Sequence, residues 1–139
     1  MRGLGKINNQ IGAAMVEFAI VLPLLLILVF GVIEFGVMFY DKAVITNASR
    51  EGARAKITGL EDQEIIKIVL NYCDGNLVNL AGNDFDPDPD DPDNPDKIII
   101  SEDGSDRIVR LEYSYDLLLG SFFGFDNTTI SAETVMRME

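Results

Sequence analysis

The most constraining feature of the sequence is one long apolar segment near its beginning. From Phe18 to Ile33 there are 16 residues without a charged or hydrogen-bonding side chain, and apolar residues resume after Glu34 as far as Tyr40. As a helix, the stretch from Phe18 to Tyr40 would be roughly 34 Å long, which matches the hydrocarbon core of a bilayer. The rest of the chain is mostly polar and too short to surround such a helix. We therefore expect this segment to cross a membrane.

Composition excludes most catalytic and metal-binding chemistry. The 139 residues include no His or Trp and a single Cys, Cys73. Histidine-based acid–base catalysis, Cys/His zinc sites and intrachain disulfides therefore cannot be built. The 23 acidic and 11 basic side chains give a net charge of −12, which repels nucleic-acid phosphates. We expect a protein that is not an enzyme, binds no nucleic acid and needs no cofactor.

Charges on either side of the apolar segment predict its orientation. Arg2 and Lys6 precede it, with no acidic residue before Glu17, whereas the residues that follow it are rich in Asp and Glu. The positive-inside rule then places the N-terminus in the cytoplasm and residues 41–139 outside. A cleaved secretory signal would have a shorter apolar stretch, with small residues after it. Here the small residues come first, so any cleavage should occur on the cytoplasmic side.

The order of motifs around this segment resembles a known family. Residues 12–18, Gly-Ala-Ala-Met-Val-Glu-Phe, are similar to a type IV prepilin cleavage site. Three further runs follow in order: Val-Leu-Pro-Leu-Leu-Leu at 21–26, Gly-Val-Ile-Glu-Phe-Gly at 31–36 and Asn-Ala-Ser-Arg-Glu-Gly-Ala-Arg-Ala at 47–55. Together they resemble the TadE-like minor pilins, or pseudopilins, of the tight-adherence (Tad/Flp) type IV pilus system.

The resemblance implies a processing site and a set of partners. A prepilin peptidase would cut between Gly12 and Ala13, so that residues 1–12 form a leader, 13–40 a transmembrane helix and 41–139 an extracytoplasmic head. The mature protein would reside in the inner membrane and associate with other pilins and pseudopilins of the Tad system during pilus assembly or initiation. The alternative is a membrane-anchored surface protein for adhesion or ligand sensing.

Glu17, Pro23 and Glu34 are the candidate assembly residues. A carboxylate at membrane depth costs a few kcal/mol unless it is paired, and Glu17 is followed immediately by Phe18 and the apolar run. The resemblance implies that Glu17 pairs with the N-terminal amine of a neighbouring subunit; interfacial exposure or a preference for the helix N-terminus is the alternative. Pro23 removes one helical hydrogen bond. Glu34 should lie near the opposite interface and contact water.

Helical periodicity continues into the head. Positions 40, 44, 48, 52 and 55 form one stripe of apolar or small residues up to Ile57, with Asp41 among the polar residues beside it. A second helix is predicted over Glu61–Cys73. Cys73 is either a small buried hydrophobic residue or a thiol for an intermolecular disulfide.

The segment Asp84–Asp96 contains seven Asp and four Pro, which predicts an extended, solvated loop. The alternating Asp86, Asp88 and Asp90, which Asp84, Asp93 and Asp96 could join, suggest calcium as an alternative. The EF-hand pattern of Gly and Glu is missing, so the solvated loop is preferred.

Three strands are predicted after this loop, over Lys97–Ser101, Arg107–Leu117 and Thr128–Met138. Residues 102–105 supply the first turn. The connection containing Phe122–Phe125 either covers the end of the sheet or touches a membrane or partner. The predicted fold class is α+β: an N-terminal transmembrane helix that continues into a small head with a second helix and a three-stranded antiparallel sheet.

Overall fold

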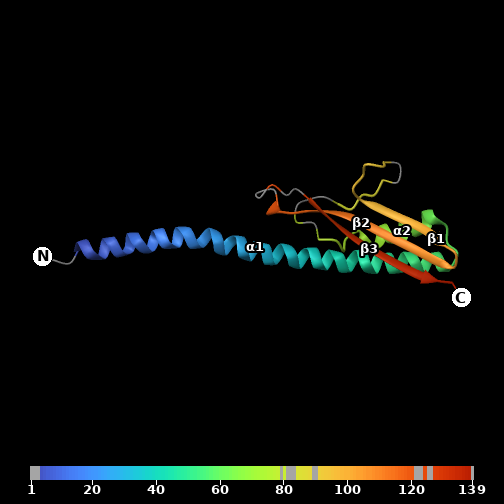
Figure 1. The fold of residues 1–139 in the computed structure, drawn as a ribbon, viewed down its shortest axis with the longest axis horizontal. Coiled ribbons are helices and arrows are strands. Elements are labelled where there is room, and N and C mark those ends of the chain that lie inside the picture. The colour runs from blue at the N-terminus through green and yellow to red at the C-terminus, as the bar shows by residue number, and fades with distance from the viewer. Residues whose placement is uncertain are drawn as a thin grey trace.

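The structure is a computed structural model that describes residues 4–78, 80, 84–88, 91–120, 124 and 127–138, with side chains from Gln10 onward. The elements follow the order α1 (Leu4–Ile57), α2 (Asp62–Cys73), β1 (Lys97–Asp103), β2 (Asp106–Asp116) and β3 (Asn127–Arg137). One long helix extends from a small head that holds every other element (Figure 1). The predicted α+β architecture is confirmed.

Helix α1 joins the apolar segment to the head without a break. Its 54 residues, which include Pro23, span about 80 Å at the usual helical rise. Nearly all the described side chains from Gln10 to Ile33 are exposed, and burial begins at Glu34. Packing against the head therefore begins before residue 41, where the sequence places the start of the head.

Helix α2 packs against α1 through residues spaced by four. Ile65, Val69 and Cys73 are its buried side chains. Asp62 and Glu64 lie in its first turn, where carboxylates interact favourably with the helix dipole. The chain leaves α2 through a turn in which Gly75 has a φ of +74°. The predicted second helix is confirmed to within one residue.

The three strands form an antiparallel meander in the order β1-β2-β3. Along β2, Val109, Leu111, Tyr113 and Tyr115 are buried, whereas the residues between them are not. This is the predicted alternation. The turn from β1 to β2 has Gly104 at its first central position with a φ of +59°, as in type II′ hairpin turns.

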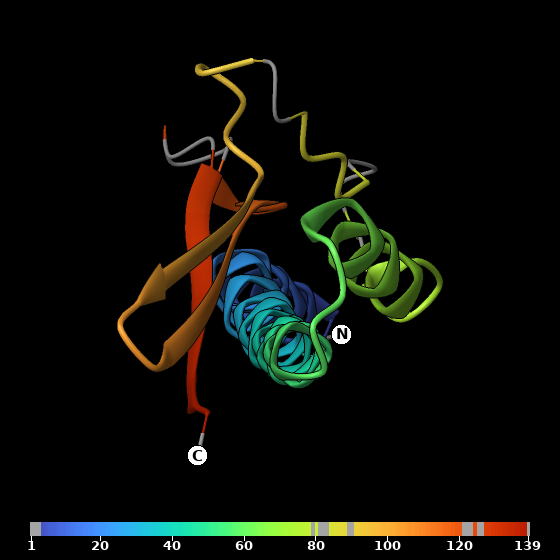
Figure 2. The same ribbon diagram turned by 90° about the vertical axis from the view of Figure 1, so that its right-hand side faces the viewer.

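Helix α1 lies between the sheet on one side and α2 on the other (Figure 2). The three layers meet at Gly52, where an added Cβ would lie 2.9 Å from Val69 Cγ2 and 3.2 Å from Val109 Cγ1. On the same face, buried Ser49 and Thr134 of β3 share a hydrogen bond of 2.6 Å between their hydroxyl oxygens. The small residues of the predicted stripe are thus core residues.

The predicted buried stripe of α1 is wrong at its N-terminal end. Tyr40 is 50% exposed, whereas Asp41, which the sequence places on a polar face, is fully buried. The buried face of α1 is wider than a single stripe because the sheet and α2 cover it from two directions. Asp41 falls within that wider face.

The contact at Gly52 generates a stability prediction. Replacing Gly52 with Ala should destabilise the head by about 1–3 kcal/mol, because the new methyl group must displace two core valines. Gly36→Ala is the matched control, since it lies in the same helix and a Cβ there meets nothing within 4 Å. Denaturant unfolding of the full chain in detergent measures the stability of both variants. Equal midpoints for the two variants would contradict the close approach.

Candidate functional site

The exposed part of α1, residues 10–33, is the first component of the candidate site; we call it the stem. Helix α1 contains a window long and apolar enough to cross a membrane, with a mean hydropathy of 2.8 and no residue of the window buried. A core helix of a soluble protein would be covered on most sides. A long, uncovered apolar helix suggests a membrane anchor.

The predicted processing residues all lie on this helix. Gly12, Ala13, Glu17 and Phe18 are helical and exposed. Glu17 follows Ala13 by four residues, so the two share one face of α1 within a single turn. No hydrogen bond or ion pair joins Glu17 to another residue in the described part of the chain. Within the described residues its carboxylate is thus not engaged by any other side chain.

The second component of the site is the junction where the stem enters the head. Glu34 is only 6% exposed, and both of its carboxylate oxygens lie 3.4 Å from the backbone nitrogen of Leu119, which donates to them. The expectation that Glu34 contacts water is therefore wrong. The segment after β2 folds over this side chain and takes the place of solvent.

Asp41 lies two helical turns beyond Glu34 and holds another segment of the head. The backbone N–H of Val78 donates to its Oδ1 at 2.8 Å, while Oδ2 has no hydrogen-bond partner among the described residues. Burial raises the pKa of this carboxyl, although the hydrogen bond from Val78 partly opposes the shift. The junction thus contains two buried carboxylates that each accept a backbone N–H from a different loop.

Tyr115 completes the junction. It is buried, and its hydroxyl has no hydrogen-bond partner in the described structure. Its pKa is raised by burial and by the negative charges of Glu34 and Asp41, which places the three groups in one electrostatic environment. Sequence reasoning missed this cluster. The spacing of seven between Glu34 and Asp41, which puts both on one helix face, is the signal that could have indicated it.

The acidic loop is attached to the sheet by Asp96. This buried carboxylate accepts the backbone N–H of Ser114 at 2.7 Å and that of Asp86 at 3.2 Å. Burial raises the pKa of Asp96. The backbone N–H of Asn94 donates to the carbonyl oxygen of Asp91 and closes a turn. The prediction that the whole loop is extended is therefore wrong at this point. The carboxylate of Asp96, at the end of this loop, therefore holds the loop in place against β2.

The calcium alternative stays a prediction. Among the described residues, no group of three or more possible ligands is close enough to hold a metal ion. Asp90, the third member of the predicted set, lies outside them. The predicted contact of Phe122–Phe125 also falls outside the described residues, apart from Gly124.

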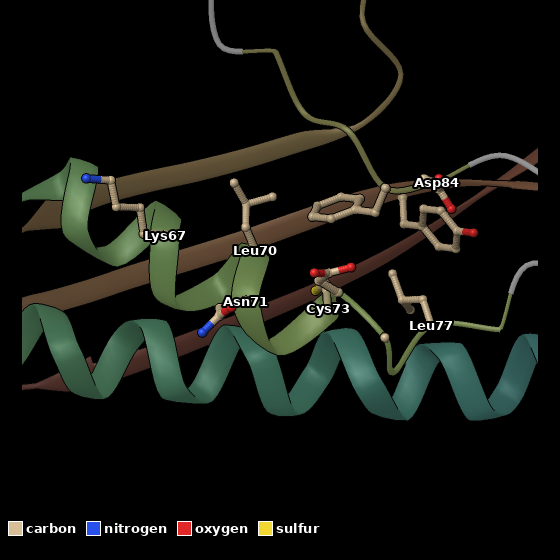
Figure 3. A pocket seen from close by; sticks show the side chains of 10 residues that line it. Lys67, Leu70, Asn71, Cys73, Leu77 and Asp84 are labelled. Atoms are coloured by element: carbon tan, nitrogen blue, oxygen red, sulfur yellow. The ribbon is translucent and has the colours of Figure 1, made fainter.

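Cys73 lines a pocket between the end of α2 and the segments that follow it (Figure 3). The pocket has a volume of about 560 Å³ and combines apolar Leu70 and Leu77 with polar Lys67, Asn71 and Asp84. Cys73 is buried, and burial raises the pKa of its thiol to about 12, which disfavours the thiolate that forms disulfides. The structure supports its interpretation as a small hydrophobic residue.

Comparison with known proteins finds a family model that matches part of α1. Residues 12–54 match the family model described as TadE-like protein. The matched region begins at the predicted cleavage site, includes the whole apolar segment and ends in the part of α1 that packs inside the head. No curated protein and no solved structure matches the chain. The resemblance inferred from the motifs is confirmed over these residues.

The buried junction generates a prediction about pH. Because the folded-state pKa of Asp41 is raised, the folded chain holds that proton more tightly than the unfolded chain. The resulting stability is present below the ordinary pKa of 3.8 and is lost as pH rises through the folded-state value. Asp41→Asn keeps an acceptor for Val78 but cannot ionise. Its stability relative to the natural chain should therefore increase with pH, by about 1.4 kcal/mol for each unit of pKa elevation.

Urea unfolding of the full chain in detergent, from about pH 4 to about pH 7, measures this difference. The pKa of Asp96 is also raised, but both the variant and the natural chain retain Asp96. The difference between their curves therefore reports the effect of Asp41 alone. Glu51→Gln, which neutralises an exposed carboxylate of α1, should give a curve parallel to that of the natural chain. A parallel curve for Asp41→Asn as well would show that the carboxyl is not desolvated.

Proposed function

We propose that this chain is a membrane-anchored minor pilin, or pseudopilin, that takes part in the assembly or initiation of a Tad/Flp pilus. One observation carries the proposal: the region that matches the TadE-like family model, residues 12–54, includes the apolar part of the stem, which the rest of the chain leaves uncovered. The family implies a Tad pilus-associated protein. The specific role as a processed assembly component is the proposal.

The proposed mechanism begins with storage in the inner membrane. Arg2 and Lys6 keep the N-terminus in the cytoplasm, while the stem spans the bilayer and the head lies outside. A prepilin peptidase then cuts between Gly12 and Ala13. The apolar stem afterwards exchanges lipid contacts for contacts with the helices of other pilins and pseudopilins. These proteins and the peptidase are the proposed partners.

Glu17 would guide this exchange through its charge. Within the membrane its carboxylate is costly, and a positively charged amine is the partner that lowers the cost most directly. Cleavage creates such an amine on Ala13, one turn away on the same helix face. A neighbouring subunit presents an equivalent amine. Pairing with that neighbour would fix how far one helix is displaced along the next.

The head would act as a rigid attachment to the stem. Glu34 and Asp41 anchor two loops of the head to α1 at the junction, so a movement of the stem is transmitted to the sheet and α2. This role requires no catalysis and no cofactor. Calcium at Asp86, Asp88 and Asp90 remains the alternative for the acidic loop.

Processing is the first test of the proposal. Co-expression with a prepilin peptidase should convert the chain to a form that begins at Ala13. Gly12→Val should abolish this conversion, because a β-branched side chain crowds the backbone at the cut. Gly31→Val is the control, since it adds the same side chain at an uncrowded position of the same helix and should be processed normally. N-terminal mass spectrometry distinguishes the two, and an uncut natural chain would refute the prepilin interpretation.

Assembly through Glu17 is the second test. Glu17→Gln should insert into the membrane at least as well as the natural chain, because it removes a charge that is costly at membrane depth. It should nevertheless reduce crosslinking to other pilins and lower piliation. Glu51→Gln removes one charge from an exposed position on the head part of α1 and should leave both readouts unchanged. Normal piliation by Glu17→Gln would rule out the pairing role.

A further inference from the structure

The outer edge of β1 is an open edge of the sheet. Strand β1 pairs with β2, and among the described residues no backbone–backbone hydrogen bond joins β1 to any other segment. Its seven residues include the apolar run Ile98–Ile100. An edge of this kind presents unpaired N–H and C=O groups to which another strand can be added.

The hydrophobic core is also open on the β1 side. Ile98 and Ile100 point toward the core but are only half-buried, whereas their cross-strand partners Leu111 and Val109 are fully buried. The difference arises because α1 covers β2 and β3 and does not extend beneath β1 (Figure 2). A strand added beside β1 would cover the two isoleucines and enlarge the same core.

A groove runs along this edge between β1, α2 and the acidic loop. It has a volume of about 250 Å³, below the usual range for small-molecule sites and suited to one or two side chains. Its apolar lining comes from Ile66 of α2, from Ile98 and Ile99 of β1, and from two prolines of the loop. The groove therefore fits side chains carried by a neighbouring strand better than a cofactor.

Charge selects the occupant of the groove. The polar lining consists of Asp88, Asp91, Asp96 and Lys97. Lys97 donates to the carbonyl oxygen of Pro92 at 3.1 Å, and both oxygens of Asp96 accept backbone N–H groups. The polar lining that a bound segment would meet is thus predominantly acidic. The whole chain has a net charge of −12. A second copy would bring the same negative charge to this edge, whereas a cationic segment would be attracted to it.

We propose that β1 is a docking edge that accepts an extended, positively charged segment of another protein as a fourth strand. Alternate apolar side chains of that segment fill the groove beside Ile66 and Ile98, and its basic side chains meet Asp88 and Asp91. The main chain of the docked segment forms hydrogen bonds with the outer edge of β1. This surface belongs to the head and does not depend on whether the leader is cleaved.

The test uses the full chain in detergent and a synthetic peptide of alternating valine and lysine, as long as β1. Hydrogen–deuterium exchange should show slower exchange of β1 amides on addition of the peptide, with β3 amides unchanged. Two control peptides should give no protection. In the first, glutamate replaces lysine; in the second, the amides that would face the edge of β1 are N-methylated. Protection at β3 instead of β1, or equal protection by any of the control peptides, would overturn the proposal.

Paired variants test the charge selection without disturbing the fold. Asp88→Asn combined with Asp91→Asn removes two charges but keeps acceptor oxygens, including the one at Asp91 that receives the Asp93 N–H. The double variant should weaken binding of the lysine peptide by roughly twofold to fivefold for each lost charge pair. Glu51→Gln combined with Asp74→Asn removes two exposed charges elsewhere on the head and should bind like the natural chain. Equal affinity of the natural chain and both double variants for the lysine peptide would refute the proposed docking edge. So would protection of β1 amides by self-association in the absence of peptide.

Discussion

The close approach of three elements at Gly52 is the contact on which the rest of the head depends. Val69 of α2 and Val109 of β2 come within van der Waals range of the same point on α1. A residue without a side chain permits this approach, so Gly52 allows both α2 and the sheet to pack closely against α1. Since α1 also includes the stem, the same contact helps to fix the head relative to the apolar helix that extends from it.

Buried carboxylates perform a second task, which is to hold the loops. Glu34 accepts the N–H of Leu119, Asp41 that of Val78, and Asp96 those of Ser114 and Asp86. Hydrogen bonds to a charged group are stronger than neutral ones. Those of Glu34 and Asp41 join α1 to segments distant in sequence, and those of Asp96 tie the acidic loop to itself and to β2. At Asp41 and Asp96, burial raises the pKa, and the backbone hydrogen bonds only partly oppose the shift. Loop attachment and sensitivity to pH therefore have one physical origin.

The molecule presents two surfaces of opposite character to possible partners. The stem is apolar on every side and contains one carboxylate, Glu17, at its beginning, which suits contact with lipid and with other helices. The edge of β1 combines half-buried isoleucines with an acidic wall, which suits an extended cationic strand. The two surfaces lie at opposite ends of α1. A partner on the head would thus leave the stem free to pack.

The sequence by itself determined the elements and the membrane segment, because both depend on local patterns. Apolar residues without interruption define the stem, spacing by four defines α2, and alternation defines β2, so each could be recognised without knowing its neighbours. The motifs from Gly12 to Ala55 likewise indicated a resemblance to TadE-like proteins, whose family model matches residues 12–54. Only the tertiary structure decided that Asp41 and Glu34 are buried, that Tyr40 is exposed and that Asp96 anchors the acidic loop. Burial of a polar side chain depends on which distant backbone N–H reaches it, and a local pattern does not contain that information.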